Sequence, residues 1–353
     1  MATDPKPLSE TGSFLDPSGK VVRELPDFAR DRDTLVEIYA AMVKTRVFDT
    51  RAVALQRTGR LGTYASSLGQ EAIGAGVASA MRAEDVFLPS FREHGAQMIR
   101  GVSPEELFLY WGGDERGNDF AGPRQDLPVC VPVASQFPHA AGVALAMQQK
   151  GAPGVAVVVG GDGATSKGDF YEAMNIVGAW RLPAVFVINN NQWAISVRRV
   201  DQTAAETLAQ KAVAAGLPGE QVDGNDVIAV REAVERALDR ARAGDGGTLI
   251  ECLSYRLGDH TTADDASRYR EEGEVSPHWK EEPVSRLRHY LVDAHGWSKE
   301  EEEALLRRCQ EEVDAAAERY LATQPEPARA MFDTLFAELP ADLAPQAREI
   351  DNG

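Results

Sequence analysis

Cysteine is scarce in this chain. Three of its 353 residues are cysteines, and they are far apart, at Cys130, Cys252 and Cys309. A disulfide framework or a cysteine metal cluster needs more cysteines at closer spacing, so neither is expected. Long apolar runs are also missing, since none reaches the roughly 20 consecutive apolar residues that span a bilayer. The sequence therefore predicts neither a disulfide-rich domain nor a membrane protein.

Positive charge is in short supply as well. The 37 Lys and Arg residues are outnumbered by 55 Asp and Glu residues, which gives a formal net charge of −18 at pH 7. Such a charge repels nucleic-acid phosphate and anionic lipid, so nucleic-acid binding is not expected. The first residues, MATDPKPLSETGS, lack the basic-then-apolar pattern of a secretion signal. A cytoplasmic protein is expected.

The remaining composition is that of a globular protein with a large core, since 43% of the residues are hydrophobic. Residues 1–30 show weak periodicity and are expected to form an extended N-terminal arm. Strand and helix patterns alternate over residues 31–275, which predicts an α/β domain with a mostly parallel, doubly wound sheet flanked by helices. Helical patterns dominate residues 276–353, which are expected to form a helical C-terminal region packed on that domain.

Local signals predict where several helices begin. Apolar residues in helical spacing over residues 35–43 indicate a first helix. Ser103-Pro104-Glu105-Glu106 has the pattern of a capping box with proline at the first helical position. Ser166 and Asp169 predict a capped start for a helix over residues 168–180. The glycine-rich stretch from Gly112 to Asp126 predicts a long loop.

Polar residues follow two apolar runs at the points where both runs end. Residues 155–159 form a short β-branched run closed by glycines, and residues 184–188 form a second run that leads into three asparagines. With the helix between them, these runs predict a βαβ unit. Ligands of open parallel sheets bind beyond the carboxyl ends of the strands, so Asp162 and Asn191 are expected to face one crevice.

The residue types in this crevice favour a cation and a phosphate. A carboxylate and an amide oxygen, without a nearby His or Cys, suit Mg²⁺ or Ca²⁺ and do not suit Zn²⁺. Gly161 and Gly163 allow backbone amides to approach an anion closely, and the next helix adds the positive end of its dipole. A dinucleotide-binding fingerprint is excluded, because Ser166 occupies the third glycine position. A lone Gly-Asp-Gly is usually a plain turn, and only its pairing with the asparagines favours a ligand site.

The segments GGDGATSKGDFYEAMN and LPAVFVINNNQWAIS resemble the thiamin-diphosphate motif in the α subunit of the decarboxylase component of 2-oxo acid dehydrogenase complexes. The resemblance continues in family order over most of the chain, through residues 43–46, 69–71, 90–93, 222–224 and 255–260. It implies a thiamin-diphosphate-binding α/β fold that uses thiamin diphosphate and Mg²⁺ as cofactors.

The resemblance also implies roles for individual residues. Asp162 and Asn191 match the residues that bind Mg²⁺ through their side chains, and Trp193 matches the one that binds it through its backbone carbonyl. Arg92 matches an arginine that contacts the diphosphate, although an isolated arginine is otherwise most often solvated. The other implied cofactor contacts are Phe91, where many relatives carry tyrosine, Val131 and Val133 along the aminopyrimidine ring, and Gly161, Gly163 and Ala164.

His260 lies in a loop after a strand-like run and matches the active-site histidine of the family. It is predicted to contact the cofactor and to be catalytic, moving protons during acyl transfer to a lipoyl group. Without the resemblance, a histidine in such a loop is usually a surface residue. The second catalytic histidine of some relatives is absent from residues 63–68, so none is assigned. Arg256 and Asp264 flank the loop and are expected to pair and to order it.

The resemblance implies a chain that is inactive alone, because in this family the carboxylic acid that activates thiamin diphosphate lies on a separate β subunit. The implied assembly is an α₂β₂ heterotetramer docked to a dihydrolipoamide acyltransferase core, whose lipoyl domain accepts the acyl group. The implied reaction is the oxidative decarboxylation of a small 2-oxo acid. The segment GRLGTY favours pyruvate, whereas residues 283–290 also resemble branched-chain relatives, so 3-methyl-2-oxobutanoate stays open. A non-catalytic, thiamin-diphosphate-binding assembly subunit is the alternative from another class.

Overall fold

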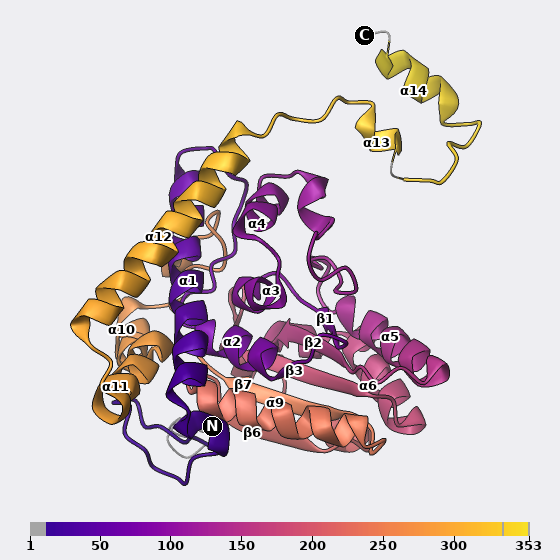
Figure 1. Cartoon of the computed structure of the whole chain (residues 1–353). Helices are drawn as coiled ribbons and strands as arrows, with labels where there is room; N and C mark the ends of the chain where they lie inside the picture. The colour runs from indigo at the N-terminus through magenta and orange to yellow at the C-terminus, as the bar shows by residue number, and fades with distance from the viewer. Residues whose placement is uncertain (1–11, 334, 352–353) are drawn as a thin grey trace.

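The fold is built on a five-stranded parallel sheet in the order β1-β2-β3-β7-β6 (Figure 1). The computed structural model describes residues 12–333 and 335–351. An antiparallel ribbon of two short strands follows β3. The strands are β1 (Val86–Leu88), β2 (Ala156–Gly161), β3 (Ala184–Asn190), β4 (Trp193–Ala194), β5 (Val197–Arg198), β6 (Gly219–Asp223) and β7 (Thr248–Leu253). The predicted, mostly parallel sheet is confirmed.

Helices make up most of the rest of the described chain. The longer ones are α1 (Arg32–Arg57), α2 (Glu71–Ala80), α3 (His94–Arg100), α4 (Pro104–Trp111), α5 (Gln136–Lys150), α6 (Gly168–Trp180), α9 (Val227–Arg242), α11 (Pro283–His295), α12 (Lys299–Ala322) and α14 (Ala344–Asp351). Single α-helical turns are α7 (Arg199–Gln202), α8 (Lys211–Ala214), α10 (Glu272–Val275) and α13 (Ala330–Asp333). Short 3₁₀ helices are η2 (Asp27–Arg30), η3 (Glu115–Asn118), η4 (Asp162–Ser166), η5 (Ala266–Arg268) and η6 (Ser276–Glu281).

Helices cover both faces of the sheet. Successive side chains of each strand point to opposite faces, and since the side chains on both faces are apolar, both faces must be covered. On one face Val158 and Phe186 pack with Phe137 of α5 and Phe170 of α6. On the other face, which α2 and α9 cover, the packed side chains are Val157, Val185 and Val187 of the strands with Ile73, Val77, Val230 and Val234 of the helices. The doubly wound arrangement is therefore confirmed.

Helix α1 joins the sheet domain to the C-terminal helices. Its predicted apolar stripe is buried against Leu287 and Leu291 of α11 and Leu305 of α12. A buried ion pair also joins α11 to the sheet, since Arg286 Nη1 lies 2.6 Å from Asp223 Oδ2 at the end of β6. Beyond α12, the segment with α13 and α14 stands away from the body of the molecule (Figure 1).

The N-terminal segment packs on the same body. Phe14 and Leu15 are buried in the cluster around α1, and their backbone N–H groups donate to Asp226 Oδ2 at 2.7 and 2.8 Å. Residues 1–11 of the predicted arm lie outside the described residues. In the part of the chain that the structure describes, no helix is long and apolar enough to cross a membrane.

The predicted helix starts have mixed outcomes. The capping box at Ser103 is confirmed, with Pro104 as the first residue of α4. The capped start at Ser166 is wrong, because the chain first forms the 3₁₀ turn η4 after β2 and Lys167 becomes the N-cap of α6. The predicted loop from Gly112 to Asp126 contains the short helix η3.

Candidate active site

Asp162 and Asn191 leave the sheet at the carboxyl ends of neighbouring strands. The last paired residues of β2 and β3 are Gly161 and Asn189, so both side chains lie just beyond the same edge. The turn after β2 also approaches the ribbon after β3 closely. A Cβ added to Gly163 would lie 2.7 Å from Ala194 Cβ, so this approach requires glycine. The two strand ends that the sequence placed in one crevice are therefore neighbours in space.

Asp162 is a buried carboxylate with a single side-chain donor among the described residues. Its Oδ2 accepts a hydrogen bond from Gln202 Nε2 at 2.8 Å. Burial raises the pKa of Asp162 to about 6, against the lowering effect of the bond from Gln202. A cation beside this carboxylate would favour its charged form. Asp162 thus has the properties expected of a ligand for a metal ion.

The segment from Asn191 to Trp193 presents two further oxygens. Asn191 Oδ1 accepts from the Trp193 backbone N–H at 3.2 Å. Gln192 has φ 71°, in the left-handed region that non-glycine residues seldom adopt, so this bend is held by its surroundings. The Trp193 indole is buried and donates to the Tyr255 hydroxyl at 3.2 Å. Carboxylate, amide and backbone carbonyl oxygens are the kinds of ligand atom that Mg²⁺ prefers.

Two buried arginines converge on His260. Arg92 Nη2 lies 3.0 Å from His260 Nδ1, and Arg256 Nη1 lies 3.4 Å from the same atom. Arginine has only donors, so Nδ1 accepts and the ring proton of His260 lies on Nε2. Burial, Arg92 and Arg256 together lower the pKa of His260 to about 4. The imidazole is therefore neutral at pH 7, with Nε2–H as its donor.

Neither arginine forms an ion pair with a carboxylate within residues 12–333 and 335–351. Arg92 donates to the backbone oxygens of Ser66 and His260, both at 2.6 Å. Arg256 donates to the Trp193 carbonyl at 3.4 Å, the Ile195 carbonyl at 2.9 Å and the Tyr269 hydroxyl at 2.7 Å. Burial and the neighbouring Arg256 lower the pKa of Arg92 to about 10. Two buried positive charges without a carboxylate partner favour an anionic ligand.

The expected direct pair between Arg256 and Asp264 is wrong. Tyr269 lies between them, because its hydroxyl accepts from Arg256 and donates to the Asp264 carboxylate. Asp264 Oδ2 also accepts from the backbone N–H of His260 at 2.9 Å. The two charged residues still order the histidine loop, but through the Tyr269 hydroxyl.

The other predicted site residues fall into two groups. Phe91 lies beside the histidine, with 6.0 Å between the two ring centroids, and Ala164 is buried at the base of η4. Val131 and Val133 lie in the loop before α5, where they are 54% and 49% exposed. Phe91 therefore contacts both His260 and Arg92, whose guanidinium carbon lies 5.3 Å from the centre of its ring, whereas the two valines face outward.

Residues 39–328 match the family model described as dehydrogenase E1 component. The chain belongs to this family. It is 40% identical over 349 residues to the pyruvate dehydrogenase E1 component subunit alpha of Staphylococcus aureus (strain Mu50), an alignment that covers 98% of this chain and 94% of the relative. It is also 40% identical over 350 residues to the protein of the same name from Staphylococcus epidermidis, with 97% and 94% covered.

Family membership confirms the thiamin-diphosphate fold that the sequence resemblance implied. This E1 chain is part of a thiamin-diphosphate-dependent 2-oxo acid dehydrogenase, as predicted.

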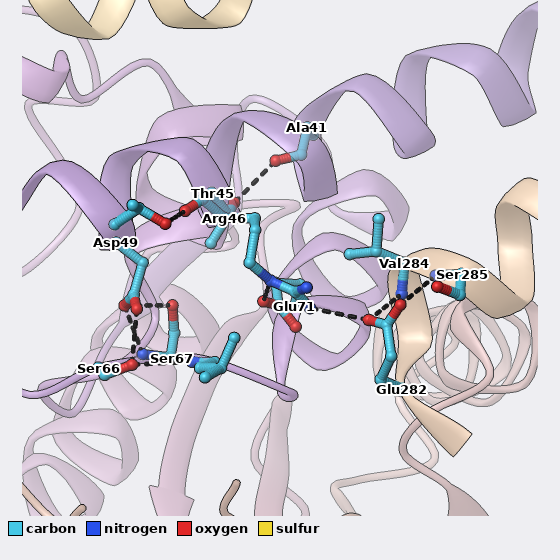
Figure 2. Close-up of polar contacts among 12 residues, drawn as sticks. Ala41, Thr45, Arg46, Asp49, Ser66, Ser67, Glu71, Glu282, Val284 and Ser285 are labelled. Atoms are coloured by element: carbon cyan, nitrogen blue, oxygen red, sulfur yellow. Dashed lines mark hydrogen bonds and ion pairs between the residues drawn. The ribbon is translucent and has the colours of Figure 1, made fainter. Parts of the chain in front are cut away.

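Sequence reasoning missed a buried carboxylate of this E1 chain that shapes the loop before α2. Asp49 on α1 accepts from the Tyr64 hydroxyl at 2.8 Å, the Ser66 hydroxyl at 2.6 Å and the Ser67 backbone N–H at 2.7 Å. Figure 2 shows Asp49 with Ser66 and Ser67. Since the Ser66 carbonyl binds Arg92, Asp49 supports the arginine indirectly. The available signal was that Asp49 continues, seven residues after Met42, the helical spacing of the apolar stripe predicted over residues 35–43.

A second polar cluster joins α1, α2 and α11 of the E1 chain. Figure 2 shows Arg46 between two carboxylates, those of Glu71 and Glu282. Glu71 is the first residue of α2, and Glu282 caps α11 by accepting from the Ser285 backbone N–H at 2.7 Å. Burial raises the pKa of Glu71, against the opposing effect of Arg46. This cluster fixes the start of α2 directly after Gln70. Gln70 is a second residue to which sequence reasoning assigned no role.

Proposed function

We propose that this chain is the α subunit of a pyruvate dehydrogenase E1 component, which decarboxylates pyruvate oxidatively and transfers the acetyl group to lipoamide. The observation that carries the proposal is the convergence on His260 of Arg92 and Arg256, neither of which has a carboxylate partner in the described part of the chain. The contact of Arg256 with the Trp193 carbonyl links this pair to the segment that bears Asn191. Buried guanidinium groups next to hard oxygen donors suit a diphosphate bound through a metal ion. The relatives named pyruvate dehydrogenase favour pyruvate over 3-methyl-2-oxobutanoate.

The residues of the crevice fit thiamin diphosphate with Mg²⁺. Asp162 and Asn191 would bind the metal through side-chain oxygens, and Trp193 through its carbonyl. Three observations support this fit: Asp162 is a buried carboxylate that forms no ion pair with a Lys or Arg of the described residues, the proposed ligand atoms are all oxygens, and a Cβ added to Gly161 would meet no atom within 4 Å. The proposed diphosphate contacts are Arg92, Gly161, Gly163 and Ala164, and the proposed contacts to the rings of the cofactor are Phe91, Val131, Val133 and His260.

His260 is the proposed proton carrier of the site. When bound, thiamin diphosphate supplies the carbon that attacks the oxo group and accepts the electron pair left by CO₂. Arg92 and Arg256 hold His260 Nδ1, which leaves Nε2–H as the hydrogen-bond donor of the ring. The neutral ring does not release this proton, so proton transfer during acyl transfer would first require protonation of the imidazole, which the negative charge of a bound diphosphate would favour. Asp264 accepts from the backbone N–H of the same residue, so His260 is held at its backbone as well as at its ring.

We further propose that the chain acts in the cytoplasm within an α₂β₂ assembly. The β subunit would supply the carboxylic acid that activates the cofactor, and a dihydrolipoamide acyltransferase core with its lipoyl domain would accept the acetyl group. The relatives named E1 component subunit alpha support a partner subunit.

We also propose a division of the chain into an arm, a domain and a C-terminal region. Residues 31–275 would form the cofactor-binding α/β domain, residues 276–353 a helical region packed on it, and residues 1–30 the N-terminal arm. The buried pair of Arg286 and Asp223 supports this packing for α11.

Loss of the metal ligand tests the proposed site. Asp162→Ala in the complex with the cognate β chain is expected to abolish Mg²⁺-dependent binding of thiamin diphosphate, measured by calorimetry, while circular dichroism stays that of the unaltered protein. Cofactor affinity equal to that of the unaltered protein would refute the site assignment. Normal cofactor binding by the unaltered complex without turnover of any 2-oxo acid would favour a non-catalytic assembly subunit instead.

A further inference from the structure

Gln70 binds two of the three asparagines at the end of β3. Its Oε1 accepts from Asn189 Nδ2 at 2.8 Å and from Asn191 Nδ2 at 3.0 Å. Gln70 is 4% exposed and precedes α2, but its side chain does not cap that helix. The side chain is therefore committed to the asparagines.

The hydrogen-bond partners fix the orientation of the Asn191 carboxamide. The Trp193 backbone N–H is purely a donor, so the group that it meets on Asn191 is the oxygen, Oδ1. The amide nitrogen of Asn191 then faces Gln70 and needs an acceptor there, which Gln70 Oε1 provides. A Gln70 side chain turned by 180° would place its own NH₂ group against two NH₂ groups.

Gln70 holds this orientation although its amide nitrogen, Nε2, forms no hydrogen bond to the described residues in it. Gln70 Nε2 is buried and has no hydrogen-bond partner among the described residues. The side chain lines a small cavity together with Thr45, Ser67, Glu71, Arg92 and Glu93. Leaving a buried donor unpaired costs free energy. The two bonds to the asparagines are thus the interactions that determine where Gln70 points.

We infer that Gln70 is a positioning residue for the metal site, because it turns Asn191 so that Oδ1 is presented to the crevice. The inference rests on the proposed Mg²⁺ site at Asp162, Asn191 and Trp193. Gln70 itself does not bind the metal. Without an acceptor at this position, the Asn191 carboxamide can rotate and present its NH₂ group, which cannot bind a cation.

The test is the Mg²⁺ concentration that half-saturates thiamin diphosphate binding. It is measured by calorimetry on the full chain in complex with its β chain, and needs no turnover. Gln70→Met keeps the size of the side chain and removes the acceptor, and is expected to raise this concentration by about 10- to 100-fold, the usual effect of losing a residue that orients a metal ligand. Gln70→Glu keeps acceptor oxygens and is expected to restore most of the affinity.

Two further variants separate positioning from a general loss of packing. Ser254→Ala removes the hydroxyl that donates to Asn189 Oδ1 at 2.9 Å, a buried bond in the same network that does not touch Asn191. Ser254→Ala is expected to leave the half-saturating Mg²⁺ concentration unchanged. In the Asn191→Asp variant both terminal atoms of residue 191 are oxygens, so either orientation presents an oxygen to the crevice. Adding Gln70→Met to this variant is therefore expected to leave the half-saturating Mg²⁺ concentration unchanged.

Each outcome has one meaning. If Asp162→Ala abolishes Mg²⁺-dependent binding while Gln70→Met binds Mg²⁺ like the unaltered protein, the positioning role is refuted and the metal site stands. If Asp162→Ala also binds normally, the metal site itself fails. If Gln70→Met does not fold by circular dichroism, Gln70→Asn replaces it, since its shorter amide withdraws the acceptor from Asn191. A normal Mg²⁺ requirement in Gln70→Asn would likewise refute the inference.

Discussion

Arg92 holds His260 at two points, because one guanidinium nitrogen donates to the ring Nδ1 at 3.0 Å and to the backbone carbonyl oxygen at 2.6 Å. The ring is thus oriented by a residue 168 positions earlier in the chain. With Arg256 on the same ring nitrogen, the histidine proposed to move protons lies beside two positive charges that oppose its protonation. The consequences of this arrangement are measurable before any cofactor is added.

We expect His260 to titrate near pH 4 in the cofactor-free protein, because burial and the two arginines oppose its protonation. As pH falls, His260 is protonated near pH 6.5 in the unfolded chain but only near pH 4 in the folded protein. The stability contributed by this group is therefore present above pH 6.5 and is lost as pH falls from 6.5 towards 4. NMR of ¹³C-labelled histidine measures the pKa directly. Arg256→Ala is expected to raise it, and a pKa of 6.5 in the unaltered protein would contradict the two-arginine geometry.

Arg256→Ala should also loosen the histidine loop. Arg256 donates to two carbonyls and to the Tyr269 hydroxyl, and the last of these bonds connects it to Asp264. Loss of these buried contacts is expected to make residues 258–268 more sensitive to limited proteolysis, mapped by mass spectrometry. Tyr269→Phe, which breaks the relay but keeps the arginine, should give an intermediate effect. Cleavage of Arg256→Ala at the rate of the unaltered chain would rule out an ordering role.

Asp49→Ala is expected to lower the free energy of unfolding by about 3 kcal/mol, because it leaves several buried donors unpaired. It should also weaken cofactor binding, since the loop around Ser66 holds Arg92. Denaturant unfolding and calorimetry measure the two effects. Tyr64→Phe is the matched control, because it removes one of the bonds to Asp49 and should cost about 1 kcal/mol. Equal losses in both variants would show that Asp49 does not organise the loop.

The sequence was sufficient to place the strand ends, because their signals are local. Apolar runs, glycines and asparagines predicted β2, α6 and β3, and a parallel sheet brings the carboxyl ends of its strands to one edge. The same logic failed at Ser166, where a 3₁₀ turn occupies the predicted cap. Hydrogen bonding within such a turn depends on packing that local patterns do not encode.

The supporting residues were not predictable from local patterns, because their partners are distant in sequence. Gln70 is 121 residues away from Asn191, and Asp49 acts on a loop that ends before the next helix. Gln70 belongs to residues 69–71, a segment of the family resemblance, but that resemblance assigned no role to Gln70 or to Asp49. Tyr269 lies between Arg256 and Asp264 only because η5 returns the chain to the loop. Such contacts follow from the assembled fold.

The central claim is that this chain supplies the metal and diphosphate half of an E1 component that acts on pyruvate. The most direct measurement is reduction of an artificial electron acceptor by the purified complex of this chain with its cognate β chain, in the presence of Mg²⁺ and thiamin diphosphate. Pyruvate and 3-methyl-2-oxobutanoate are compared as substrates, with the α chain alone as the control. We predict a kcat/KM for pyruvate at least about 10-fold higher than for the branched acid, and no turnover by the α chain alone. Preference for the branched acid, or turnover without the β chain, would contradict the account.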